Sequence, residues 1–254
     1  MNRYKIEFIP KRGVGSEQQE IWKLLACGAP ITPASECLPD WWKNLKRKNN
    51  NAYNNKPTST AKTCPGIFDF TRAGYILSMW ADVHFLWNCG KGDEWQIKTS
   101  SILQHLHEPF TSHSHKQVEG APFLEDSCRL MIKLNSPWYI QVPTGVSLFL
   151  TQPFYHINND FTVCPGIIDP EINRISNKEL NVFLKFNVSD KPIKILRGQP
   201  LMQIIPFVRA EYEFENNVPE SLDEIDMLNI AQRAIIDDED SHLKVNRIPK
   251  NYNA

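Results

Sequence analysis

The stretch from Ile140 to Asp169, IQVPTGVSLFLTQPFYHINNDFTVCPGIID, decides the fold that we predict for this 254-residue chain. Two short apolar runs each follow residues that favour turns. Pro143-Thr144-Gly145 precedes the run 146–150, and Pro165-Gly166 precedes Ile167-Ile168. Because proline and glycine favour tight turns, each run is predicted to be a β-strand.

The same pattern, short apolar runs separated by turn residues, continues on both sides of this stretch, from residue 66 to residue 210. Predicted strands are the apolar runs at 74–87, 94–99, 128–135, 138–143, 146–150, 160–168, 180–188, 193–198 and 201–214. Few helical patterns lie between them, which favours an antiparallel sandwich or barrel. We therefore predict a mainly β core domain over residues 66–210.

The flanking regions differ in composition from this core. Residues 1–65 are predicted to form a strand within YKIEFIP, a short helix over 16–28 with Ser16 as its N-cap, and an extended polar arm with one helical turn at 40–45. Residues 211–254 are acidic and predict a helix followed by a tail. The formal net charge is −1 because the positive charges of the basic arm and the negative charges of the C-terminal region nearly cancel.

The order of core motifs resembles the dUTPase and dCTP-deaminase β-clip superfamily. The likeness is carried by Pro143 and Gly145 in a turn, by Gly166–Asp169 (GIID) and by Gly198–Phe207 (GQPLMQIIPF). The resemblance implies an antiparallel β-clip or sandwich core, dUTPase-like or jelly-roll-like, and assembly into trimers. The chain is also similar to uncharacterised phage and bacterial proteins that share these motifs and the GYI of residues 74–76. That second likeness implies a phage origin.

The phosphate-binding residues of dUTPase-like enzymes are missing from this sequence. The resemblance implies that Asp169 would orient the attacking water and that Mg²⁺ would bind the triphosphate. However, Leu150–Phe154 (LTQPF) stands where that family has Pro-Arg-Ser. A triphosphate needs several converging positive or N–H donors. We therefore interpret Asp169 as a turn residue, and a divergent nucleotide pyrophosphohydrolase remains an alternative.

A histidine-rich segment offers a second enzymatic alternative. His105, His107, His113 and His115, with Glu108 or Glu119 as a carboxylate and His156 as a later ligand, suit a cupin-like Fe²⁺ oxygenase. Two histidines one residue apart on a strand would share one face. The neighbouring proline and serines instead favour a solvated loop without metal.

The basic arm carries the candidate interaction residues Trp41, Trp42, Lys43, Lys46, Arg47 and Lys48. Nucleic-acid binding would use such cations with stacked aromatics. Because the tryptophans cluster at one end of the arm, we favour anchoring onto a neighbouring protein.

Two copies of Cys-Pro-Gly-Ile, at 64–67 and 164–167, are interpreted as turns that precede buried strands, with cysteine as a packed apolar residue. The sequence shows no secretion signal and no apolar run of the length that spans a membrane. Together these features predict a non-enzymatic structural protein without a cofactor. It would be made in the host cytoplasm and incorporated into a phage virion as a capsid decoration or tail-associated protein, contacting its own copies and other virion proteins.

Overall fold

The structure is a computed structural model that describes residues 3–50, 57–87, 95–114, 117, 127–153, 155–156, 160–170, 178–187 and 192–216. The chain divides into two compact units. The larger comprises Met1–Asn44 and Thr71–Arg209, and the smaller comprises Leu45–Phe70 and Ala210–Ala254. The predicted C-terminal helix lies outside the described residues.

The larger unit is built from antiparallel sheets, which confirms the mainly β prediction. The first sheet has the order β1-β9-β13-β11, with β8 also paired to β9. Its strands are β1 (Glu7–Pro10), β8 (Phe110–Ser114), β9 (Ser127–Gln141), β11 (Phe161–Val163) and β13 (Glu179–Asn187).

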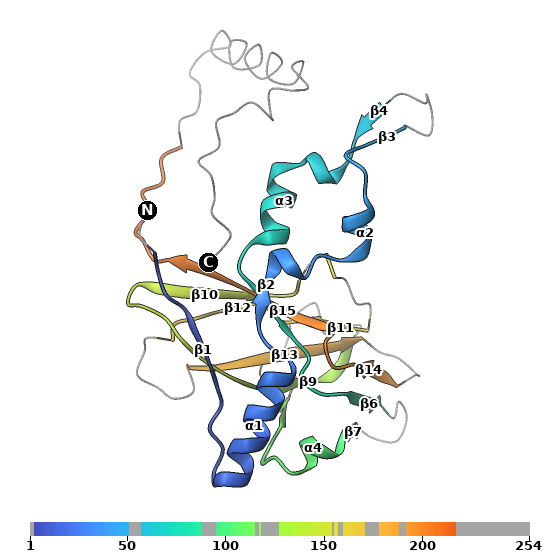
Figure 1. Ribbon diagram of the computed structural model, residues 1–254, viewed down its shortest axis with the longest axis vertical. Helices are drawn as coiled ribbons and strands as arrows, with labels where there is room; N and C mark the ends of the chain where they lie inside the picture. Colours follow the sequence, from blue (N-terminus) through green and yellow to red (C-terminus); the bar gives the residue numbers. More distant parts are fainter. Residues whose placement is uncertain are drawn as a thin grey trace. The chain divides into compact units, whose positions relative to one another are not determined.

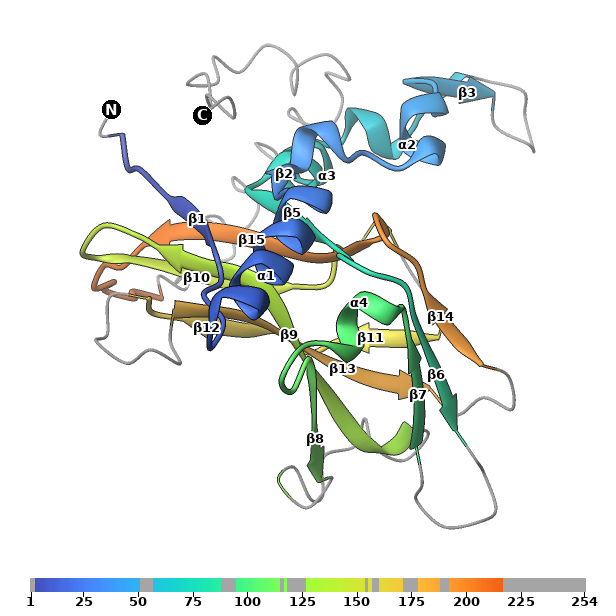
Figure 2. The same ribbon diagram turned by 60° about the horizontal axis from the view of Figure 1, so that its bottom comes forward.

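The second sheet has the order β12-β10-β15-β5-β2. Its strands are β2 (Thr32–Pro33), β5 (Tyr75–Ser78), β10 (Val146–Thr151), β12 (Gly166–Ile168) and β15 (Pro200–Val208). A third sheet has the order β14-β6-β7, from β6 (Val83–Trp87), β7 (Trp95–Thr99) and β14 (Ile193–Ile195). In both views the sheet of β10 and β15 lies over that of β9 and β13 (Figures 1 and 2).

Residues from all three sheets meet in one hydrophobic core. Along β13 buried and half-buried positions alternate, as expected for a strand with one face in the core. Phe186 on β13 packs against Phe85 on β6, with ring centroids 4.6 Å apart. Leu148 on β10 and Ile204 on β15 enter the same cluster from the second sheet. Burial of this apolar surface is the main stabilising contribution to the fold.

The N-terminal segment is part of this core unit. Strand β1 pairs with β9, and Phe8 lies opposite Ile140. Helix α1 (Ser16–Gly28) buries Trp22 and Leu25 in the hydrophobic core. The predicted cap was wrong by one residue, because Gly15 precedes the helix and Ser16 already belongs to it.

Several local predictions were wrong. The predicted strands at 128–135 and 138–143 form one continuous strand, β9. Pro137 lies within this strand and does not end it. The run 74–87 is divided into β5 and β6. The first Cys-Pro-Gly-Ile begins helix α3 (Pro65–Arg72), where proline suits the first turn, and Cys64 is exposed.

The second Cys-Pro-Gly-Ile does enter a strand, β12 (Gly166–Ile168), but this edge strand is not buried as predicted, since Ile167 is 63% exposed. Burial raises the pKa of the half-buried Cys164 thiol, against the effect of the Lys185 charge. Gly145 and Gly198 adopt positive φ as their turns require, whereas Gly166 does not.

The polar arm contains short ordered elements. In the larger unit these are a 3₁₀ turn (Ala34–Glu36) and α2 (Asp40–Asn44), which confirms the predicted helical turn. In the smaller unit they are β3 (Lys48–Asn50), β4 (Pro57–Ser59) and a 3₁₀ turn (Ala61–Thr63). Helix α4 (Ser101–Gln104) follows β7. None of the helices in the described ranges is long and apolar enough to cross a membrane.

Candidate functional site

An aromatic pocket of about 460 Å³ opens on the surface of the larger unit. It forms where α2, the segment after β10 and the start of β15 come together. Its lining residues are Pro39, Trp41, Tyr155, His156, Gln199 and Pro200. We refer to it below as the Trp41 pocket.

The two adjacent tryptophans of α2 have opposite environments. Trp41 is 48% exposed, whereas Trp42 is 1% exposed. Consecutive residues of a helix point in different directions, so only one of the pair can enter the core. The prediction that Trp42 contacts a partner is therefore wrong, and the prediction for Trp41 stands as a proposal.

Tyr155 holds Trp41 in place. The Trp41 indole Nε1 donates a hydrogen bond of 3.0 Å to the backbone carbonyl of Tyr155. The Tyr155 ring lies 6.0 Å from each of the two tryptophan rings, and the rings of Trp41 and Trp42 meet edge-on at 5.6 Å. Such ring pairs stabilise one geometry, so Trp41 presents a fixed aromatic surface to solvent.

His156 supplies the titratable group of the Trp41 pocket. Its backbone N–H donates to the Pro153 carbonyl at 2.7 Å. Burial lowers the pKa of the imidazole, a hydrogen bond with the Cys37 backbone opposes this shift, and the Lys43 charge lowers the pKa further. The folded protein therefore favours the neutral ring, which is uncharged against the aromatic wall.

The lowered pKa of His156 makes folding depend on pH. The unfolded chain binds the proton below the ordinary histidine pKa of about 6.5, whereas the folded chain binds it only at lower pH. We expect stability to fall as pH is lowered through that window, and to fall less in a His156→Gln variant. Urea unfolding at a series of pH values measures the stability of the wild-type protein and of the variant. If the two showed the same pH dependence, the lowered pKa of His156 would be contradicted.

Asp169 is held by two side chains at the strand ends. Ser147 Oγ on β10 donates a hydrogen bond to Asp169 Oδ1, and Arg209 Nη1 lies 3.6 Å from Oδ2. Both carboxylate oxygens are thus engaged, and Ser147 is 1% exposed. This geometry joins β10, β12 and the end of β15, as expected for a structural carboxylate.

The histidine-rich segment is not one strand. His105 and His107 are exposed residues of the turn after α4, whereas His113 lies on β8. His113 Nδ1 is hydrogen-bonded to Gln117 Oε1 at 3.0 Å, and its ring packs on Phe183. Within the described ranges no group of three metal-ligating side chains forms a site. His115 and Glu119 lie outside those ranges.

The predicted cations are divided between the two units. Lys43 forms an exposed ion pair with Asp40 at 3.3 Å. In the smaller unit, Thr60 donates hydrogen bonds to the carbonyls of Lys46 and Arg47, and Lys48 opens the β3–β4 hairpin. These contacts use backbone oxygens of Lys46 and Arg47, and their side chains take no part in them.

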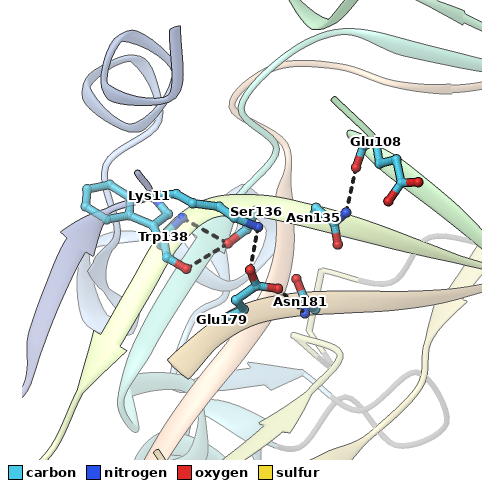
Figure 3. Close-up of polar contacts among 7 residues, drawn as sticks. All are labelled: Lys11, Glu108, Asn135, Ser136, Trp138, Glu179 and Asn181. Atoms are coloured by element: carbon cyan, nitrogen blue, oxygen red, sulfur yellow. Dashed lines mark hydrogen bonds and ion pairs between the residues drawn. The ribbon is translucent and has the colours of Figure 1, made fainter. Parts of the chain in front are cut away.

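A polar cluster that the sequence did not reveal lies where β1 meets β9 and β13 (Figure 3). Lys11 Nζ contacts Glu179 Oε1 at 2.8 Å, with 13% and 21% of the two side chains exposed. Asn181 Nδ2 donates to Glu179 Oε2 at 3.3 Å. The Lys11 ammonium also lies 5.3 Å from the centre of the Trp22 ring, which links α1 to this ion pair.

The cluster continues along β9 (Figure 3). Asn135 Nδ2 donates to the carbonyl of Glu108 at 2.6 Å, and the Trp138 backbone N–H donates to Ser136 Oγ at 3.2 Å. Glu108 has a φ of 49°, an uncommon conformation for a residue other than glycine. The Asn135 bond fixes the chain before β8 onto β9, and the Ser136 bond lies within β9, so we assign the cluster a structural role.

Comparison with known proteins gives no family for this chain: it matches no protein-family model and no curated protein. Function is therefore inferred from residues and geometry. Sequence reasoning found Trp41 from its position in a basic, tryptophan-containing segment. It missed Tyr155, because no pattern in the sequence indicates that a residue 114 positions away binds the indole of Trp41.

Proposed function

We propose that this chain is a non-enzymatic structural component of a phage particle, a capsid decoration or tail-associated protein, built on a β-clip-like core. The Trp41 pocket is the contact site of the proposal. The observation that carries it is a tryptophan that is 48% exposed yet fixed by a hydrogen bond to Tyr155. Tryptophan and tyrosine are enriched among the residues that dominate binding energy at protein interfaces.

Preorganisation of Trp41 favours association. A side chain that is already ordered in the free protein loses less conformational entropy on binding. The pocket beside it has two prolines and a neutral imidazole in its wall, so the wall gives up few hydrogen bonds with water when an apolar side chain of a partner enters. Trp42 is buried whereas the Trp41 ring is about half exposed, so Trp41 is the one of the two that can contact a partner.

Exposed apolar residues at the end of the described chain support the same proposal. At the end of β15, Phe207 and Val208 are 37% and 46% exposed. In the smaller unit, Tyr212 and Phe214 are 86% and 91% exposed and alternate with glutamates. Exposed aromatics in such a series are typical of interaction segments. Proposed partners are other copies of this chain, as trimers, and other virion proteins.

The geometry of the charged residues favours binding over catalysis. Asp169, the candidate base of a pyrophosphohydrolase, uses both oxygens within the protein. His113 contacts Gln117 and Phe183. Among the described residues, the contacts of Asp169 and His113 therefore support neither the pyrophosphohydrolase nor the oxygenase alternative.

The proposal predicts that Trp41→Ala weakens self-association or incorporation into particles by tenfold or more, since removing a hot-spot side chain costs about 2 kcal/mol or more and tryptophan is enriched among hot spots. Analytical ultracentrifugation measures the first, and quantitative mass spectrometry of purified particles measures the second. Val14→Ala, which truncates an 89% exposed apolar residue elsewhere, is the matched control. A monomer absent from particles, or nucleotide hydrolysis lost on Asp169→Asn, would contradict the proposal.

A further inference from the structure

A second pocket, of about 470 Å³, lies on the larger unit where four separate segments of chain converge. These are the end of α1, the turn between β5 and β6, the start of α4 and the turn before β15. Leu24, Leu25 and Ile102 contribute apolar wall, together with Trp80. A pocket of this size with mostly apolar walls and a few polar groups is typical of small-molecule sites.

Two polar atoms of this pocket are buried without a partner. Trp80 is 2% exposed, and neither its Nε1 nor Ser100 Oγ has a hydrogen-bond partner within the described part of the chain. Ser100 occupies the N-cap position of α4, yet its hydroxyl does not cap the helix. An unsatisfied buried polar group costs about 1–3 kcal/mol. Solvent reaches neither atom, so both belong to the wall of the pocket and a ligand in it would not contact them.

The rim of the same pocket carries one charge of each sign. The Arg197 backbone N–H donates to Asp82 Oδ1 at 2.7 Å, and the guanidinium Nε and Nη2 donate to the Gly28 carbonyl at 3.2 and 2.9 Å. Among the ion pairs of the described residues, none joins the Arg197 guanidinium to the Asp82 carboxylate. Two opposite charges therefore line one pocket without neutralising each other directly.

We propose that this pocket binds a small zwitterion with an apolar body, of the class of apolar α-amino acids. The ligand ammonium would pair with Asp82, and its carboxylate would pair with Arg197. Charge-assisted hydrogen bonds of this kind are the stronger ones in proteins. The apolar side chain would lie against the aliphatic wall. This site is independent of the assembly function proposed above.

The charged groups are already held in position. The turn that carries Arg197 is fixed to the β5–β6 turn, because Met79 N–H donates to the Gln199 carbonyl and Gly198 N–H donates to the Met79 carbonyl, both at 2.8 Å. Ser100 N–H donates to the Asp82 carbonyl at 3.1 Å. A preorganised site loses little entropy on binding, which favours affinity for a small ligand.

Isothermal titration calorimetry with L-phenylalanine tests the ligand class on the full chain. We expect saturable binding. Phenylalanine amide lacks the carboxylate and 3-phenylpropionate lacks the ammonium, so each is expected to bind about tenfold more weakly or worse, since a charge-assisted hydrogen bond contributes about 1.5–3 kcal/mol. Glycine lacks the apolar side chain and is expected not to saturate. Absence of binding by L-phenylalanine, or equal affinity for 3-phenylpropionate, overturns the proposal.

Variants test the location. Arg197→Gln and Asp82→Asn are each expected to weaken L-phenylalanine binding by about tenfold or more. Lys194→Gln, which removes an exposed cation from β14, is the matched control and should leave affinity unchanged. Circular dichroism checks that each variant remains folded. Wild-type affinity in both Arg197→Gln and Asp82→Asn overturns the assignment to this pocket.

Discussion

Gly74→Ala is expected to destabilise the core unit by about 3 kcal/mol or more, because it adds a steric collision to an unfavourable backbone conformation. Gly74 precedes β5 with a φ of 69°, and a Cβ placed there would lie 1.9 Å from the backbone carbonyl oxygen of Ile204. Ile204 belongs to β15, the central strand of the second sheet. Relief of the collision would therefore separate β5 from β15.

Two other glycines provide a graded control for this prediction. Gly198 has a φ of 84°, but among the described residues no atom beyond its chain neighbours lies within 4 Å of the position that a Cβ would occupy, so Gly198→Ala should cost only the unfavourable backbone conformation, about 1–2 kcal/mol. Gly66 lies in α3, where a Cβ would likewise meet no other part of the described chain, and alanine there should be neutral or stabilising by up to about 1 kcal/mol. Urea unfolding followed by circular dichroism measures all three. Equal effects of Gly74→Ala and Gly198→Ala would contradict the close approach.

Trp42→Ala is expected to lower the free energy of unfolding by about 3–5 kcal/mol, the usual cost of removing a large buried aromatic side chain. Trp42 is 1% exposed and packs against the rings of Trp41 and Tyr155. Its removal leaves a cavity under α2 and withdraws the support of the Trp41 pocket. We therefore expect loss of both stability and partner binding.

Trp41→Ala is the matched comparison within the same helix. Its side chain is about half exposed, so the expected loss of stability is about 1 kcal/mol or less, while the loss of binding should be large. Thermal unfolding measures the stability of the two variants. If Trp41→Ala remains stable, its loss of association reflects the missing Trp41 contact and not unfolding. If Trp41→Ala destabilised the protein as much as Trp42→Ala, Trp41 would be a core residue and not a contact site.

Much of the fold was predictable from local patterns. The strands β10, β13 and β15 and the turn at Gly145 were predicted from apolar runs and turn residues and are confirmed. The helix over 16–28 was also predicted, from apolar residues that follow a polar start and end at Gly28. The β-clip resemblance itself stays a proposal.

Local sequence patterns predicted the wrong secondary structure where contacts with distant segments of the chain determine it. Pro137 was expected to separate two strands, but β1 and β13 both pair with β9, and these pairings hold it as one strand. The two Cys-Pro-Gly-Ile segments have the same local chemistry, yet one leads into helix α3 and the other leads into the edge strand β12. Identical short sequences take different structures because packing against the remainder of the chain outweighs local propensity.

By itself, the sequence determined that the chain is mainly β and that residues 16–28 form a helix, since these depend on residues a few positions apart. It also predicted a contact role for the Trp41-Trp42 pair, which remains a proposal for Trp41. Only the tertiary structure decided that Trp42 is buried, that Tyr155 fixes Trp41, and that Asp82 and Arg197 face one pocket from positions 115 apart. Such juxtapositions follow from how the sheets pack, and no local pattern in the chain encodes them.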